Sequence, residues 1–179
     1  MKTSPRTIIV ELQHIDNDVD IRGLFDDAKL FSRRPKEQLK EINFDLIKNW
    51  VSHCDKFHGE ICRPQAIQQD HHDGYAQYFR LVDVRRNCVV DAKAEWDYFA
   101  LSYVWGQTRP MLQLVLDNKD QLYEEGALAQ DTHLIPHTII DAIEAVRRID
   151  GKYIWVDALC IMQDDYDEKV KVIGEMDLI

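Results

Sequence analysis

The stretch "IPHTIIDAIEAVRRIDGKYIWVDALCI", from Ile135 to Ile161, decides the fold. Its first half repeats apolar residues at helical spacing, which predicts an amphipathic helix over 136–149. Gly151 follows that helix, and glycine suits the left-handed position after a last turn. The second half, 153–161, is almost entirely apolar, which is typical of a parallel strand covered on both faces. We therefore predict a helix that runs directly into a buried strand.

A second apolar run lies before this unit. "YFALSYV", Tyr98 to Val104, predicts a further strand. A strand, a crossover helix and another strand form a βαβ unit, in which the two strands run parallel. We therefore expect 98–104 and 153–161 to be adjacent parallel strands of an α/β fold.

The flanking segments carry weaker patterns. "FDLIKNWVSHC" (44–54) has apolar residues at helical spacing, and two β-rich runs, 78–84 and 88–92, surround a short turn. These patterns predict a helix followed by a β-hairpin. We expect a variable N-terminal extension over 1–43. A lead-in helix and hairpin that pack on the domain would follow over 44–95, and the domain itself over 96–179.

Two shorter predictions concern the second half of the chain. "MLQLVL" (111–116) is interpreted as a short strand, and the residues after it as a loop with a helical turn. Residues 167–179 begin another helix, with Val170, Ile173 and Met176 on one side.

Polar side chains cluster where the two predicted strands end. In parallel α/β sheets, ligands bind outside the carboxyl ends of the strands. If the strands are neighbours, one rim would hold Ser102, Tyr103, Trp105, Gln163 and Asp164. The alternative for Trp105 is that its side chain fills the core. Gly106 would let the backbone turn sharply or approach a ligand closely.

Asp157 lies inside the predicted buried strand 153–161. A carboxylate there is costly unless it is paired or hydrogen-bonded. Two interpretations stay open: Asp157 accepts hydrogen bonds from loop amides and stabilises the fold, or it anchors a ligand in the crevice. Cys160, in the same run, is interpreted as a packed thiol rather than a nucleophile.

Cys54, His58 and Cys62 are spaced four residues apart. A structural zinc site needs a fourth ligand, and His53, His71 or His72 would be candidates. The spacing lacks a CxxC pair, so we expect packed, reduced side chains and no metal.

Composition limits the function classes. The chain has 179 residues with 22 basic and 32 acidic side chains, for a net charge of -10. This balance repels phosphate backbones and disfavours nucleic-acid binding. No run approaches the roughly 18 apolar residues of a membrane helix, and the N-terminal residues lack a signal-peptide core. We expect a cytoplasmic or nuclear protein with reduced cysteines.

These motifs together carry a family resemblance. "YFALSYVWG", then "IPHTIIDAIEAVRRIDGKYIWVDALCIMQDD" and a later methionine, Met176, resemble the fungal heterokaryon-incompatibility (HET) domain over roughly 96–179. The resemblance implies a role in non-self recognition and in programmed death of incompatible fused cells.

The resemblance also implies a fold and a chemistry. HET domains are similar to Toll/interleukin-receptor (TIR) domains, which are flavodoxin-like, and some TIR relatives cleave NAD at the nicotinamide–ribose bond. By that analogy the pocket would be lined by Ser102, Tyr103, Trp105 and Gly106, with Asp157 and Gln163 orienting the hydroxyls of NAD.

The family's later block, which the analogy expects to supply a catalytic glutamate, would lie beyond Ile179. The sequence is therefore interpreted as a HET domain that is incomplete at its C-terminus, with an unpaired outer edge on its second strand and no NAD hydrolysis of its own. The alternative functions are a non-enzymatic interaction module that signals by self-association, and a zinc-stabilised binding module. Expected partners are a second copy of the chain, or an allelic or NLR-type protein.

Overall fold

The computed structural model describes residues 7–11, 42–57, 78–93, 96–105 and 111–174. The described strands are β1 (Thr7–Glu11), β2 (Arg80–Asp83), β3 (Cys88–Asp91), β4 (Tyr98–Ser102) and β5 (Tyr153–Trp155). The described α-helices are α1 (Phe44–Phe57), α2 (Lys119–Tyr123), α3 (Ala127–Gln130), α4 (His137–Arg148), α5 (Asp157–Cys160) and α6 (Tyr166–Gly174). Two short 3-10 helices, η5 (Leu116–Asn118) and η6 (Thr132–Leu134), complete the described elements.

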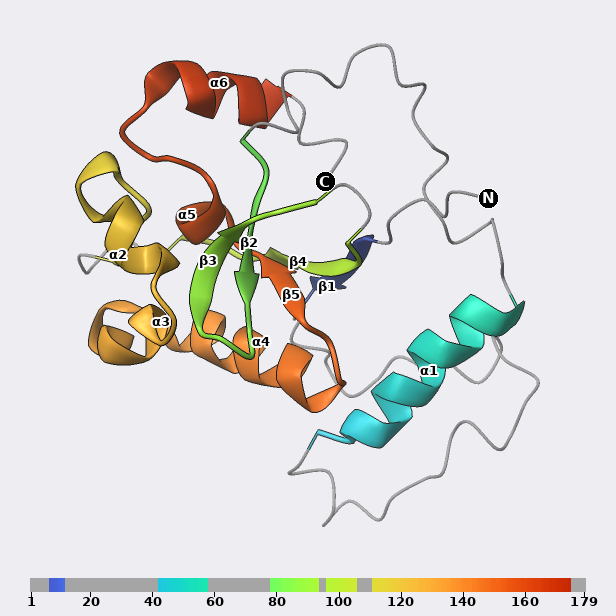
Figure 1. The fold of residues 1–179 in the computed structure, drawn as a ribbon. Coiled ribbons are helices and arrows are strands. Elements are labelled where there is room, and N and C mark those ends of the chain that lie inside the picture. The colour runs from blue at the N-terminus through green and yellow to red at the C-terminus, as the bar shows by residue number, and fades with distance from the viewer. Residues whose placement is uncertain (1–6, 12–41, 58–77, 94–95, 106–110, 175–179) are drawn as a thin grey trace.

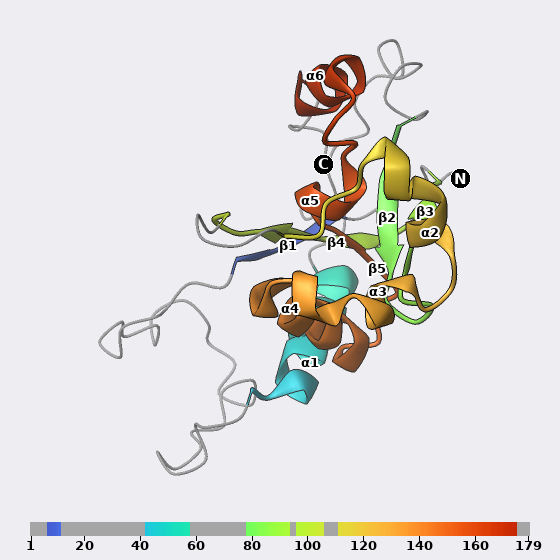
Figure 2. The ribbon, with the colours of Figure 1, turned by 90° about the vertical axis from the view of Figure 1, so that its left-hand side faces the viewer.

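The described strands form one sheet in the order β1-β4-β5-β2-β3. β4 and β5 are adjacent and parallel, with Phe99 opposite Ile154, and α4 connects them and packs on both. The predicted βαβ unit is therefore confirmed. Figures 1 and 2 show α4 and α1 on one side of the sheet, and α5 and α6 on the other.

The predicted hairpin is confirmed, but it joins the same sheet as β4 and β5, so that sheet is not all parallel. β2 pairs antiparallel with β3 and also antiparallel with β5, so the sheet is mixed. The Asp83 carboxylate closes the turn by accepting hydrogen bonds from the N–H groups of Arg85 (2.9 Å) and Arg86 (3.0 Å). Because β2 covers β5, the expected unpaired edge on the second strand of the βαβ unit is wrong.

β1 is a strand that the sequence analysis did not assign. It runs parallel to β4 at the edge of the sheet, with Thr7 opposite Tyr98 and Glu11 opposite Ser102. Its short apolar run lies among charged residues, so local pattern gave no strong signal.

The predicted strand 153–161 is too long. β5 ends at Trp155, and α5 follows as a single helical turn in which the N–H groups of Leu159 and Cys160 donate to the Val156 carbonyl, at 2.9 and 2.8 Å. The run is apolar because both the strand and this turn are buried. A short apolar run cannot distinguish a buried strand from a buried turn of helix.

Gly151 does not take the left-handed position predicted for it. Asp150 does, with φ of 64°, and its carboxylate contacts Lys48 Nζ at 2.8 Å. Gly151 is needed for space instead, because a Cβ there would lie 2.6 Å from both Phe99 Cε2 and Val146 Cγ1. Its missing side chain lets α4 and β4 approach each other closely.

Two predictions in the second half have different outcomes, because the predicted strand 111–116 is wrong and the predicted helix is confirmed. Residues 111–115 are extended but join no sheet; Leu114 instead accepts a hydrogen bond from Gln163 N–H and donates one to the Ala158 carbonyl, both at 2.9 Å. The predicted helix is α6, in which Val170 and Ile173 lie on one side as expected; that side faces solvent, and the buried side chains are Glu168 and Val172. Met176 lies outside the described residues.

The core is formed by the side chains of β2, β4 and β5 with those of α4 and α5. In the described part of the chain, no helix combines the length and apolar character that crossing a bilayer requires.

Candidate functional site

The carboxyl ends of β4 and β5 meet at one edge of the sheet, and two predicted site residues join there. Trp105 Nε1–H donates a hydrogen bond of 2.6 Å to Asp157 Oδ2, and the Ala158 N–H donates one of 2.7 Å to Oδ1. Asp157 begins α5 and is half-buried, so the expectation that it lies within a strand is corrected. Its carboxylate stabilises the turn and also presents a charge at the rim.

Tyr103 lies beside this carboxylate. Its hydroxyl oxygen is buried, and no described group meets it in hydrogen-bond geometry. Burial, followed by the charge of Asp157, raises the pKa of the phenol well above its usual range. Most buried polar groups have partners. A phenol without one, next to a carboxylate, is therefore the unusual feature of this rim.

The Gln163 side chain is hydrogen-bonded to the backbone of the rim. Its Nε2 donates to the carbonyl oxygens of Asp157 and Ile161, both at 3.0 Å, and its Oε1 accepts from Lys169 Nζ at 2.9 Å. A ligand that used this side-chain amide would compete with these bonds.

The remaining predicted residues are less closely joined. Asp164 is exposed, and its carboxylate accepts the N–H of Leu116 at 3.1 Å. Ser102 is exposed at the end of β4, and Gly106 lies outside the described residues. The structure thus brings together Tyr103, Trp105, Asp157 and Gln163.

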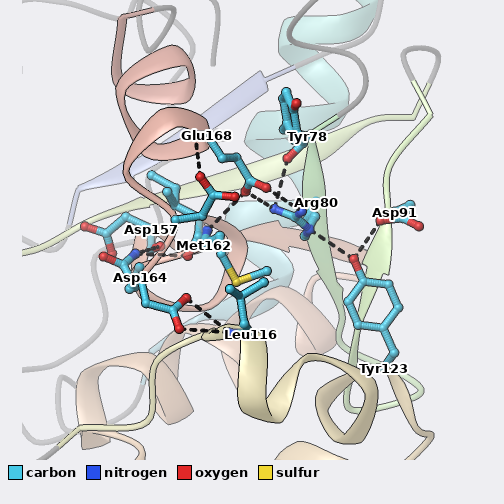
Figure 3. Close-up of polar contacts among 12 residues, drawn as sticks. Tyr78, Arg80, Asp91, Leu116, Tyr123, Asp157, Met162, Asp164 and Glu168 are labelled. Atoms are coloured by element: carbon cyan, nitrogen blue, oxygen red, sulfur yellow. Dashed lines mark hydrogen bonds and ion pairs between the residues drawn. The ribbon is translucent and has the colours of Figure 1, made fainter.

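A buried ion pair at the same edge was missed by the sequence analysis. The Arg80 guanidinium binds the Glu168 carboxylate in a bidentate manner, with Nη2 at 3.0 Å from Oε2 and Nη1 on Oε1 (Figure 3). Arg80 is 4% exposed and Glu168 is 5% exposed. Burial alone would lower the pKa of Arg80, but the Glu168 carboxylate more than offsets burial and the pKa is raised.

The pair extends into a network that connects four elements. Arg80 Nε–H donates to the Tyr123 hydroxyl at 3.0 Å, which in turn donates to Asp91 Oδ1 at 2.6 Å. Glu168 Oε1 also accepts the Met162 N–H at 3.3 Å. Because β2 runs antiparallel to β5, its amino end lies at the carboxyl edge of β5, so the network borders the rim. A charge within the apolar run "YFRLVDV" was the available signal, but sequence does not name a partner 88 residues away.

The cysteines of the described structure are free thiols that are buried or half-buried. Cys160 is buried, and burial raises its pKa to about 12, as expected for a packed thiol. Cys54 is half-buried on α1, whereas His58 and Cys62 lie outside the described residues. Within the described ranges, no three metal-ligating side chains gather closely enough to hold an ion.

The comparison with protein families bears on this edge of the sheet. Residues 98–179 match the family model of the heterokaryon incompatibility protein (HET). This HET segment begins with β4 and includes the βαβ unit, the Trp105–Asp157 bond and α6. No curated protein and no solved structure matches the chain. The match suggests a function related to heterokaryon incompatibility, in a fungal context.

The HET segment makes part of its packing contacts with residues that precede it in the chain. Glu168 lies within it, whereas Arg80, which neutralises the Glu168 carboxylate, lies in the preceding hairpin. The hairpin also covers β5 through β2. Residues before the matched segment therefore contribute directly to the sheet and to the network beside the rim.

Proposed function

We propose that this chain is a HET-type module of fungal non-self recognition that acts in programmed cell death, and that its rim binds NAD in a TIR-like manner. The observation that carries the ligand proposal is the buried Tyr103 hydroxyl, which has no hydrogen-bond partner and lies next to the Asp157 carboxylate. A ribose hydroxyl can donate to a carboxylate and accept from a phenol at once. The match over 98–179 supports the HET-type role.

The proposed chemistry assigns limited roles to the residues at hand. Cleavage of the nicotinamide–ribose bond develops positive charge on the ribose, and a nearby carboxylate stabilises that charge. Asp157 already accepts hydrogen bonds from Trp105 and Ala158, so we assign it to orienting the ribose. Trp105 would hold this carboxylate in place, and the catalytic residue is unassigned. We therefore expect residues 1–179 to bind NAD without hydrolysing it.

The binding experiment compares Tyr103→Phe with Tyr166→Phe by calorimetric titration with NAD. Tyr166 is exposed, so its hydroxyl serves as a matched control. We expect loss of the Tyr103 hydroxyl to weaken NAD binding by roughly 5- to 10-fold, the value of about 1 kcal/mol for one hydrogen bond, and the control to bind as the parent does. Equal affinities for all three proteins, or no binding by the parent, would contradict the ligand proposal. Nicotinamide release by 1–179 would contradict the assignment of Asp157 to orientation alone.

A second candidate is a non-enzymatic interaction module that signals by self-association, or through an allelic or NLR-type partner. The exposed apolar side of α6 favours the form with a different partner protein, because such a face is available for contact with another chain. Expression in a fungal host separates the two candidates. Cell death that Tyr103→Phe leaves unchanged would favour the interaction module, whereas cell death that Tyr103→Phe prevents would favour the NAD-binding role.

A further inference from the structure

α6 has two different faces. Glu168 and Val172 are buried against the rest of the molecule, whereas Tyr166, Val170 and Ile173 are 78%, 51% and 49% exposed. The exposed three are spaced by four and three residues, so they form one stripe along the helix. A helix with one buried and one exposed apolar face is suited to contact a further element.

A further exposed apolar side chain lies on η5, which is hydrogen-bonded to the loop before α6. Asp164, in the loop before α6, accepts the N–H of Leu116 at 3.1 Å and so holds the start of η5 beside that loop (Figure 3). Leu116 is 62% exposed. We call the exposed apolar residues Leu116, Tyr166, Val170 and Ile173, together with their acidic neighbours Asp117, Asp164 and Asp167, the α6 surface.

In the described structure, the aspartates of the α6 surface form no ion pair with the lysines near them in the sequence. Asp117, Asp164 and Asp167 are exposed, and no ion pair in the described part of the chain involves them. The neighbouring lysines are directed elsewhere: Lys169 Nζ donates to Gln163, Lys119 Nζ lies 5.7 Å from the Tyr123 ring centroid, and Lys171 Nζ lies 5.4 Å from that of Tyr78. The surface therefore combines exposed apolar area with negative charge, in a chain of net charge -10.

We propose that the α6 surface is the docking site for a cationic amphipathic helix of a partner protein. Charge complementarity selects this occupant, because its lysines or arginines would meet the aspartates while its apolar side covered the stripe. A second copy carries the same net charge of -10, which opposes its docking. The inference is independent of NAD cleavage, since no described hydrogen bond links these residues to the Asp157 carboxylate.

The test measures binding of labelled 18-residue peptides by fluorescence anisotropy. The probe is an amphipathic helix of leucine and lysine, compared with one of leucine and glutamate and with a polar peptide of serine and lysine. We expect only the leucine–lysine peptide to bind the full chain. Asp117→Lys/Asp167→Lys should weaken that binding about tenfold. Loss of two exposed ion pairs costs about 1.4 kcal/mol in total, which is a tenfold change in Kd. Val170→Ser should weaken it at least as much.

Matched controls lie on other elements. Asp141→Lys reverses an exposed acid on α4, and Ile42→Ser removes an exposed apolar side chain before α1. Both should leave peptide binding within twofold of the parent. Equal weakening by Asp141→Lys, equal binding of the serine–lysine peptide, or no binding at all would overturn the proposal. Sedimentation of the chain alone adds one further outcome: a dimer that Val170→Ser dissociates would assign the surface to a second copy instead.

Discussion

At the scale of single residues, the Arg80–Glu168 pair is the most exacting contact in the molecule. Both side chains are almost fully buried, and the charge of each balances the opposite charge of the other. Removing one partner of a buried pair leaves an uncompensated charge and costs about 3–5 kcal/mol, whereas replacing both by apolar residues is often tolerated. The pair is therefore a test of how strongly the hairpin holds α6.

We expect Glu168→Gln to lower the free energy of unfolding by about 3 kcal/mol, because Arg80 would stay buried without a counter-charge. Urea unfolding of the variant and of the parent measures the difference. The double variant Arg80→Met/Glu168→Met is the control and should recover most of the loss. A single variant as stable as the parent would show that the carboxylate charge is not needed at this position.

At the scale of elements, the contact between α4 and β4 depends on Gly151. A Cβ at this position would lie 2.6 Å from Phe99 Cε2 and from Val146 Cγ1, and 3.0 Å from the Val146 carbonyl oxygen. We expect Gly151→Ala to destabilise the fold by about 1–3 kcal/mol, the usual cost of overpacking. Thermal unfolding measures it. Gly174→Ala, where nothing lies within 4 Å, is the control and should be close to neutral.

Elements also show where sequence patterns succeed. The stripe of apolar residues in α4 and the apolar runs in β4 and β5 predicted the βαβ unit correctly. In each segment the spacing of apolar residues along the sequence follows the pattern of burial. The limit of β5 could not be predicted, because α5 is as buried as the strand before it. The left-handed conformation predicted for Gly151 was wrong for a different reason. The local preference for glycine in a left-handed turn does not reveal that Phe99 packs there.

At the scale of the whole molecule, one buried thiol and two half-buried phenols with raised pKa values couple stability to alkaline pH. Burial raises the pKa of Cys160 from 9.0 to about 12, and burial likewise raises the pKa values of Tyr103 and Tyr123 from 10.0. In the unfolded chain these groups lose protons above pH 9 to 10, whereas the folded chain keeps them. The unfolded state then binds fewer protons, so stability falls as pH rises.

We expect the free energy of unfolding to be unaffected by these groups below about pH 8 and to fall between pH 9 and 12. The slope should approach 1.4 kcal/mol per pH unit for each group that has ionised only in the unfolded chain. Denaturant titrations at several pH values provide the measurement. Tyr103→Phe should flatten the fall, and Tyr166→Phe, at an exposed position, should not. A stability that is constant up to pH 12 would contradict the prediction.

The sequence by itself determined the α/β class, the parallel pairing of β4 with β5 and the gathering of polar residues at their carboxyl ends. Each of these follows from local periodicity or from the order of the elements along the chain. Tertiary structure alone decided the placement of β2 against β5, the Arg80–Glu168 pair and the burial of the Tyr103 hydroxyl. These features join residues that are distant along the chain, and their energies depend on desolvation and on alignment in space, which no local pattern encodes.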